Sequence, residues 1–146
     1  MFFENLLYSP ISIYFQKQLS NILVVDDEEE IQNLVRMMLE AEDHKVSIAS
    51  NGEEALALIS RNHFDLIILD VVMQRIDGLE VCRKIRKTES MKNTPIIMFS
   101  ALGRGVDTML DENDKADDFL EKPFERKTLL EKVNNLLKKE NDSQLF

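Results

Sequence analysis

The sequence is poor in several residue types that define whole classes of protein. It has one cysteine, Cys82, no tryptophan, four glycines and three prolines in 146 residues. A single cysteine excludes an internal disulfide and a zinc site built from several cysteines. No apolar run reaches the roughly 20 residues that a membrane-spanning helix requires. These absences favour one domain in the reducing environment of the cytoplasm.

Basic residues are also in the minority. Lys and Arg number 18 against 27 Asp and Glu, which gives a formal net charge of −9. A surface of that sign repels the phosphate backbone of nucleic acids. We therefore expect no direct nucleic-acid partner and no membrane insertion, in a chain long enough to bury one sizeable core.

Residues 1–19 differ from the rest of the chain because they are apolar and carry few charges. Glu4 precedes the apolar stretch and Pro10 interrupts it, so the segment does not resemble a secretory signal peptide. Two interpretations stay open. The segment is either an extension that is disordered or packs on the domain surface, which we favour, or an element for oligomerisation or partner docking.

From Asn21 onward, strand-like and helix-like patterns alternate. Continuous apolar runs at residues 22–25, 66–69 and 96–99, with weaker ones at 46–49 and 119–120, are typical of parallel strands covered on both faces. Apolar stripes at residues 31–39 and 129–137 have helical spacing. The alternation predicts an α/β fold, with a doubly wound parallel sheet of five strands and five helices.

Several helix starts carry their own signals. Ser50 with Glu53 and Asp77 with Glu80 have the spacing of a capping box. Pro123 suits the first turn of the last helix. The weakest predicted helix spans residues 103–115, which offer few apolar positions. We also expect Cys82 to be an inert core thiol, and His44 and His63 to face solvent.

Polar side chains stand where the predicted strands end. Asp26 and Asp27 follow the first strand, Asp70 ends the third, Ser100 ends the fourth and Lys122 follows the fifth. Right-handed crossovers place all these ends at one edge of the sheet. Any one of these carboxylates alone is more often a helix cap or a solvated loop residue. Together they predict a site.

Three carboxylates at one site repel one another unless a cation compensates them. Oxygen ligands without His or Cys favour Mg²⁺ or a similar divalent ion such as Mn²⁺. Because Mg²⁺ commonly binds through one or two carboxylates plus a phosphate, the site suits a phosphoryl group. Lys122 and Ser100 are suited to contact the remaining oxygens of that group.

Four segments in order resemble the receiver domain of two-component response regulators, the family that includes the chemotaxis response regulators. They are residues 22–28 (ILVVDDE), 65–73 (DLIILDVVM) followed by Asp77-Gly78, 95–101 (PIIMFSA) and 117–124 (DDFLEKPF). The resemblance covers most of the chain and implies a flavodoxin-like sheet of order 2-1-3-4-5. We assign residues 20–140 to this domain and residues 141–146 to a C-terminal tail.

The resemblance implies a role for each matching acidic residue. Asp70 matches the phosphoacceptor, which receives a phosphoryl group from a phosphohistidine. Asp26 and Asp27 match the acidic metal pair, and one Asp70 oxygen and the backbone carbonyl of Val72 would complete the protein ligands. The expected cofactor is Mg²⁺ or Mn²⁺. Lys122 would pair with a phosphoryl oxygen, and its bond to the following proline is typically cis.

The switch residues follow from the same resemblance. Ser100 would donate its hydroxyl to the phosphoryl group, together with the backbone N–H of Ala101. Phe119 matches an aromatic residue that rotates inward as Ser100 moves, so phosphorylation would bias the face made by the fourth helix, fifth strand and fifth helix. Two residues depart from the pattern of many relatives: Gln74 stands where they have proline, and Lys115 where they have glycine. Val72 and Leu102 stand at positions that in relatives influence how water reaches the acyl phosphate. Both are apolar here, so we expect slow self-dephosphorylation.

We therefore predict a stand-alone cytoplasmic receiver that is no enzyme beyond its own phosphorylation and dephosphorylation. Its expected partners are a sensor histidine kinase or phosphotransfer protein and a downstream protein, and formation of a homodimer stays open. One alternative is a receiver-like protein-binding module without phosphotransfer. Another is a small phosphatase-type hydrolase, disfavoured because Val72 stands where such enzymes usually have a second Asp.

Overall fold

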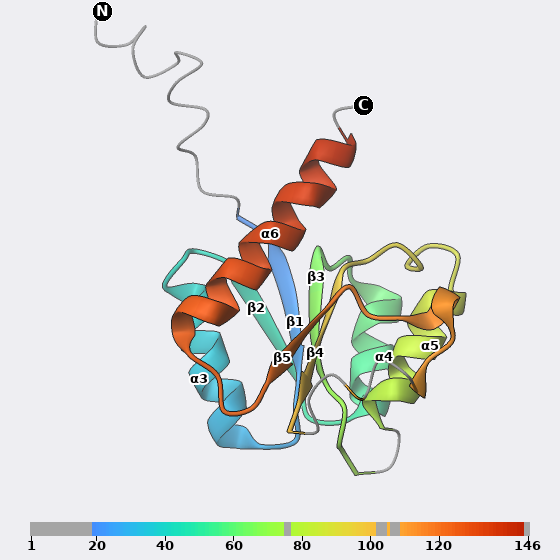
Figure 1. Cartoon of the computed structure of the whole chain (residues 1–146), viewed down its shortest axis with the longest axis horizontal. Helices are drawn as coiled ribbons and strands as arrows, with labels where there is room; N and C mark the ends of the chain where they lie inside the picture. The colour runs from blue at the N-terminus through green and yellow to red at the C-terminus, as the bar shows by residue number, and fades with distance from the viewer. Residues whose placement is uncertain (1–18, 75–76, 102–104, 106–108, 145–146) are drawn as a thin grey trace, which may run out of the picture.

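Five strands form one parallel sheet in the order β2-β1-β3-β4-β5 (Figure 1). The computed structural model describes residues 19–74, 77–101, 105 and 109–144, with side chains up to residue 138. The strands are β1 (Asn21–Val25), β2 (Lys45–Ala49), β3 (Leu66–Asp70), β4 (Ile96–Ser100) and β5 (Asp118–Glu121). All five predicted strands and the predicted sheet order are confirmed.

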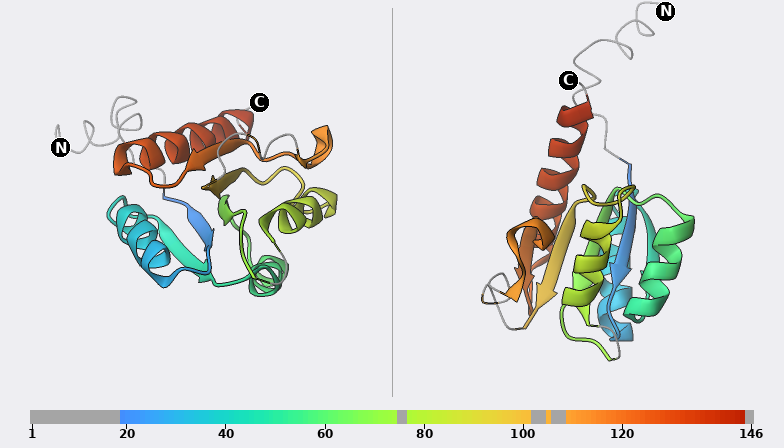
Figure 2. Two further views of the ribbon diagram at one scale, coloured as in Figure 1. Left: turned by 60° about the horizontal axis from the view of Figure 1, so that its bottom comes forward. Right: turned by 90° about the vertical axis from the view of Figure 1, so that its right-hand side faces the viewer.

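Four α-helices lie in the described part of the chain. They are α3 (Glu29–Glu40), α4 (Gly52–Arg61), α5 (Gly78–Lys87) and α6 (Arg126–Gln144). Figure 2 (left) shows α3 and α6 on one face of the sheet and α4 and α5 on the other. The predicted doubly wound, flavodoxin-like architecture is confirmed.

The central strands are apolar along their whole length because both faces of the sheet are covered. Within β1, Ile22 and Val24 pack against α3 and α6, whereas Leu23 and Val25 pack in the cluster that includes α4 and α5. Every residue of β3 and of β4 is buried. A core on each side of the sheet therefore fixes the strands whose carboxyl ends carry the polar residues.

The segment between β4 and β5 differs from the prediction of a fifth helix. Its described residues contain a short 3-10 helix, η2 (Glu112–Asp114), and residues 102–104 and 106–108 lie outside the described part. Side chains of α5 bind its backbone: Arg83 donates to Met109 O at 3.2 Å and Arg86 to Lys115 O at 2.9 Å. Interactions with α5 thus hold the described part of this segment.

Helix starts correct two of the sequence predictions. Asn51, not Ser50, caps α4, since its side chain accepts a hydrogen bond from the backbone N–H of Glu54. The Asp77 side chain accepts from the N–H of Glu80, as predicted. α6 begins at Arg126, so Pro123 lies before the helix and not in its first turn.

The two ends of the domain are close to each other in the fold (Figure 1). Residues 1–18 of the predicted extension lie outside the described part, and Leu19 is exposed. α6 continues to Gln144, so residues 141–144 are helical where we expected a tail. No helix among the described residues is long and apolar enough to cross a membrane.

His44 is buried, contrary to the prediction that it faces solvent. Its Nδ1 accepts a 3.2 Å hydrogen bond from the N–H of Ser20, which enters β1. His63 is exposed, as expected. Cys82 lies in the core, where its thiol donates to the Asp114 carbonyl at 3.2 Å. Burial raises the pKa of this thiol to about 11.

Candidate functional site at the carboxyl ends of the strands

The carboxylates of Asp26 and Asp70 lie at neighbouring strand ends. Val25 of β1 is paired with Leu69 of β3, so the residues that follow them emerge side by side. Asp26 has no exposed surface and Asp70 is 4% exposed. Two adjacent buried carboxylates are unfavourable without a compensating cation, because their like charges repel each other.

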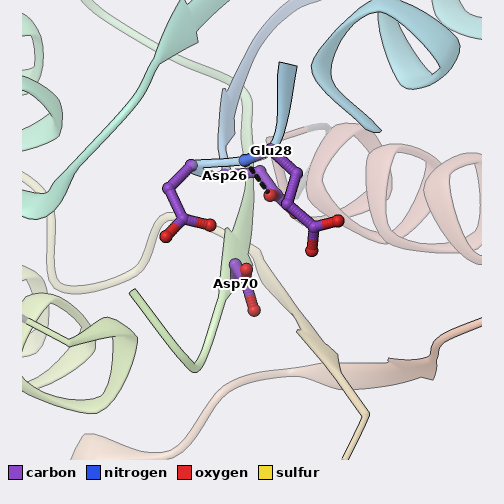
Figure 3. A group of neighbouring side chains, drawn as sticks. Asp26, Glu28 and Asp70 are labelled. Atoms are coloured by element: carbon purple, nitrogen blue, oxygen red, sulfur yellow. Dashed lines mark hydrogen bonds between the residues drawn. The ribbon is translucent and has the colours of Figure 1, made fainter. Parts of the chain in front are cut away.

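Asp27 and Glu28 extend this pair into a cluster of four acidic residues. One carboxylate oxygen from each of Asp26, Asp27, Glu28 and Asp70 lies within 4.8 Å of the others. Figure 3 shows Asp26, Glu28 and Asp70 gathered where β1 and β3 end. A donor set made only of oxygens, partly exposed to solvent, fits the preference of Mg²⁺ for hard ligands and retained water.

Lys122, the residue that follows the edge strand β5, supplies a positive charge. Its Nζ lies 2.7 Å from Asp26 Oδ2, 3.2 Å from Asp70 Oδ2 and 3.5 Å from Glu28 Oε1. Its peptide bond to Pro123 is cis. Its backbone N–H donates to the Ser100 carbonyl at 3.0 Å, which ties it to the end of β4. The ammonium group of Lys122 therefore links the carboxylate of Asp70, at the end of β3, to those of Asp26 and Glu28, which follow β1.

The surroundings change the acidity of both partners. Burial, followed by the negative charge of Asp26, raises the pKa of Asp70 from 3.8 to about 6, although Lys122 and the N–H of Val72 oppose this. Burial lowers the pKa of Lys122, but its hydrogen bond to Asp26 and the charges of Asp70 and Asp26 outweigh this, so the net pKa is raised. Lys122 thus stays charged at neutral pH, and Asp70 is mostly ionised there.

The backbone beside Asp70 approaches α5 closely. A Cβ atom placed on Gly78 would lie 2.0 Å from the carbonyl oxygen of Asp70. The N–H of Gly78 donates to the carbonyl of Val71 at 3.0 Å. Only glycine permits this approach, so Gly78 lets the start of α5 fix the loop that follows Asp70.

The loop after β3 also presents Val72. Its N–H donates to Asp70 Oδ1 at 3.2 Å, and the residue is 60% exposed. The predicted metal-binding role of the Val72 carbonyl stays a prediction. Val72 therefore lies beside the Asp70 carboxylate with its side chain at the solvent boundary.

The predicted switch residues lie on the neighbouring strands. Ser100 is the buried last residue of β4, and the following Ala101 is exposed. Phe119 is half-buried in β5. Ser100 and Phe119 line a cavity of about 400 Å³ that Phe124 and Lys132 also border. The two predicted switch side chains thus share one cavity.

Two residues of the site were missed by the sequence analysis. Glu28 completes the acidic cluster, and its N–H donates to Asp26 Oδ1 at 2.9 Å. Its position directly after Asp27 was the available signal. Gln32 donates from its side-chain amide to the carbonyl of Asp26 at 2.6 Å. No feature of the sequence pattern pointed to Gln32.

Comparison with known proteins agrees with this geometry. The protein-family model of the response regulator receiver domain matches residues 22–134 of this chain. The transcriptional regulatory protein ResD of Bacillus subtilis is 40% identical over 127 residues, which are 87% of this chain and 52% of ResD. The chain therefore spans about half the length of the curated relatives it matches.

Solved structures agree as well. A putative response regulator from Chloroflexus aurantiacus is 33% identical, with a TM-score of 0.76 over 82% of this chain and 98% of that one. The response regulator TrrA of Thermotoga maritima, solved in complex with Mg²⁺-BeF, is 39% identical, with a TM-score of 0.72 over 81% of this chain and 99% of that one. The resemblance seen in the sequence is confirmed: this chain belongs to the response regulator receiver domain family.

Proposed function

We propose that the chain accepts a phosphoryl group on Asp70 from a phosphohistidine of a sensor histidine kinase or phosphotransfer protein. The observation that carries the proposal is the position of Asp70 at the end of β3, next to Asp26 and 3.2 Å from Lys122 Nζ. A nucleophilic carboxylate, a fixed cation and further carboxylates for a metal are then in one place.

In the proposed step, an oxygen of the ionised Asp70 attacks phosphorus. An O–P bond forms, and the P–N bond to the donor imidazole breaks. The imidazole leaves with the electron pair of that bond and takes up a proton. Lys122 Nζ, now bound to Asp70, would then contact an oxygen of the transferred group as a point charge.

Asp26, Asp27 and Asp70 would hold Mg²⁺ or Mn²⁺, with Glu28 beside them and the carbonyl of Val72 as a further ligand. Bound there, the ion would neutralise the repulsion between the carboxylate and the incoming phosphoryl group. The four carboxylates and the TrrA complex with Mg²⁺-BeF support this assignment. We expect Asp26 to contribute partly by fixing Lys122, since one of its oxygens accepts that bond.

Ser100 and the N–H of Ala101 would bind phosphoryl oxygens from the β4 side. A shift of Ser100 would open or fill the cavity that it shares with Phe119, and so bias the surface of β5 and α6. We propose that a downstream protein reads this surface. We also propose that the chain works in the cytoplasm and catalyses only its own phosphorylation and dephosphorylation. Stand-alone action and homodimer formation stay predictions.

Acetyl phosphate tests the phosphoryl transfer. The protein is incubated with acetyl phosphate and Mg²⁺, and its intact mass is followed. We expect one added phosphoryl group in the wild type and in Asp65→Asn, and none in Asp70→Asn. Asp65 is a matched control because it precedes the same strand at the opposite end, where it accepts a hydrogen bond from Asn21.

The other outcomes separate the alternative functions. If the folded wild type forms no adduct and still binds a protein partner, the chain is a binding module without phosphotransfer. Continuous release of phosphate from varied phosphate esters would indicate a hydrolase. Either result would overturn the proposal.

A further inference from the structure

Gln32, in the first turns of α3, makes two hydrogen bonds that leave its own helix. Its side-chain Nε2 donates to the backbone carbonyl of Asp26 at 2.6 Å and to Ser50 Oγ at 3.1 Å. The residue is 9% exposed. The two N–H groups of a side-chain amide can serve both acceptors at once. Gln32 therefore connects α3 to the end of β1 and to the loop before α4.

The bond to Asp26 fixes the backbone from which the acidic cluster projects. The N–H of Asp26 donates to the carbonyl of Ala49 at 3.1 Å, so the two backbone groups of Asp26 are held by different elements. The carbonyl of Asp26 belongs to the peptide unit that leads to Asp27. Holding that carbonyl therefore sets the direction in which the exposed Asp27 leaves the strand.

Asp27 depends on this restraint more than its neighbours do. The carboxylate of Asp26 is held by Lys122 at 2.7 Å and by the N–H of Glu28 at 2.9 Å. No hydrogen bond to the Asp27 carboxylate is found among the described residues, and Asp27 is exposed. Its position relative to Asp70 thus follows from the backbone between Asp26 and Glu28.

We propose that Gln32 is a positioning residue for divalent-cation binding, which it supports by fixing the Asp26–Asp27 peptide unit. The inference rests on the proposed function, because it assumes that this cluster binds the cation. Groups that orient metal ligands commonly change metal affinity by tenfold or more when removed. Gln32 contacts a backbone group and no carboxylate, so we expect an effect near the lower end, about tenfold.

The test compares Gln32→Met with Asn33→Met. Both replace a polar side chain of α3 with methionine, but Asn33 is exposed. Binding of Mg²⁺ is measured by calorimetric titration of the folded proteins, and thermal unfolding is recorded with a chelator present. We expect Gln32→Met to bind Mg²⁺ about tenfold more weakly than the wild type, and Asn33→Met to bind like the wild type.

A second measurement separates positioning from general loss of structure. The rate of adduct formation from acetyl phosphate is measured at increasing Mg²⁺. In Gln32→Met the half-saturating Mg²⁺ concentration should rise about tenfold, while the rate at saturating Mg²⁺ stays close to that of the wild type. A variant that is only less well folded would lose rate at every Mg²⁺ concentration.

The remaining outcomes would contradict the proposed role of Gln32. If the wild type binds no Mg²⁺, the proposed function fails and the inference fails with it. If the wild type binds Mg²⁺ and Gln32→Met binds it equally well, only the inference is wrong. If Gln32→Met does not fold, Gln32→Asn, which keeps the amide but shortens its reach, is measured instead. If neither variant folds with Mg²⁺ present, Gln32 is a folding residue and the inference is overturned.

Discussion

Lys122 donates a 2.7 Å hydrogen bond to Asp26, a residue with no exposed surface. The lysine side chain is itself only 14% exposed. Removing one partner of a buried ion pair leaves the other charge uncompensated, at a cost of about 3 to 5 kcal/mol. The pair therefore contributes to the stability of the domain as well as to the geometry of the site.

We expect Lys122→Met to lower the free energy of unfolding by about 3 kcal/mol in the presence of a chelator. Millimolar Mg²⁺ should restore part of this loss, since the ion compensates the same carboxylates. Urea unfolding measures both effects. Lys132→Met is the control, because Lys132 Nζ lies 2.9 Å from a carboxylate oxygen of Asp118, which is partly exposed. This substitution should lower the free energy of unfolding by no more than about 1 kcal/mol. Equal stability of the two variants would contradict the prediction.

Asp70→Asn should stabilise the metal-free protein at neutral pH. The folded pKa of Asp70 is about 6, above its ordinary value of 3.8, so the folded state binds the proton more tightly than the unfolded state. Stability of the wild type is therefore lost as the pH rises from about 4 to 6. The advantage of Asn should be absent below pH 4 and reach about 1 to 3 kcal/mol above pH 6.

Urea unfolding with a chelator, repeated from below pH 4 up to pH 8, measures this difference. A difference between the two proteins that stays constant over the whole range would show that Asp70 is not the group responsible. A less stable Asp70→Asn at pH 7 would show that its bond to Lys122 outweighs its burial.

Gly78→Ala should destabilise the domain and disturb the site together. The added Cβ would meet the backbone oxygen of Asp70 at 2.0 Å, and a backbone atom can move only with its strand. Overpacking of this kind costs about 1 to 3 kcal/mol or more. Gly105→Ala is the control, because an added Cβ there meets nothing within 4 Å. Unfolding and adduct formation are measured in both variants, and an unaffected Gly78→Ala would refute the close approach.

Val72→Asn should shorten the lifetime of the phosphorylated protein. Val72 lies two residues after Asp70 and is 60% exposed, so an amide there can orient water toward the acyl phosphate. The decay of the mass adduct after removal of acetyl phosphate gives the lifetime. Val72→Ala, which adds no hydrogen-bonding group, should decay like the wild type. A lifetime unchanged in Val72→Asn would remove the basis for expecting slow self-dephosphorylation. Leu102, the second apolar residue of that argument, lies outside the described residues.

The strands could be predicted because parallel strands covered on both faces require apolar residues on both sides. β3 and β4 meet this condition at nearly every position and stand out in the sequence. The site followed from the strands, since parallel topology brings their carboxyl ends to one edge. Asp26, Asp70 and Lys122 are brought together as expected.

Local alternatives limited the rest of the prediction. Ser50-Asn51 and Glu53-Glu54 offer two capping registers one residue apart, and the fold uses the second. The bond from Gln32 to Ser50 spans 18 residues and depends on how α3 meets the loop before α4, which local spacing does not encode. His44 is buried and its Nδ1 accepts a hydrogen bond from Ser20, another contact between distant parts of the chain.

The single thiol of this chain has a practical consequence. Cys82 has no exposed surface, and burial holds its pKa near 11, so very little reactive thiolate forms at neutral pH. A cysteine introduced at an exposed position, such as Met37→Cys on α3, would therefore react with a maleimide dye in preference to the native thiol. Fluorescence labelling of the receiver can then begin from the natural sequence.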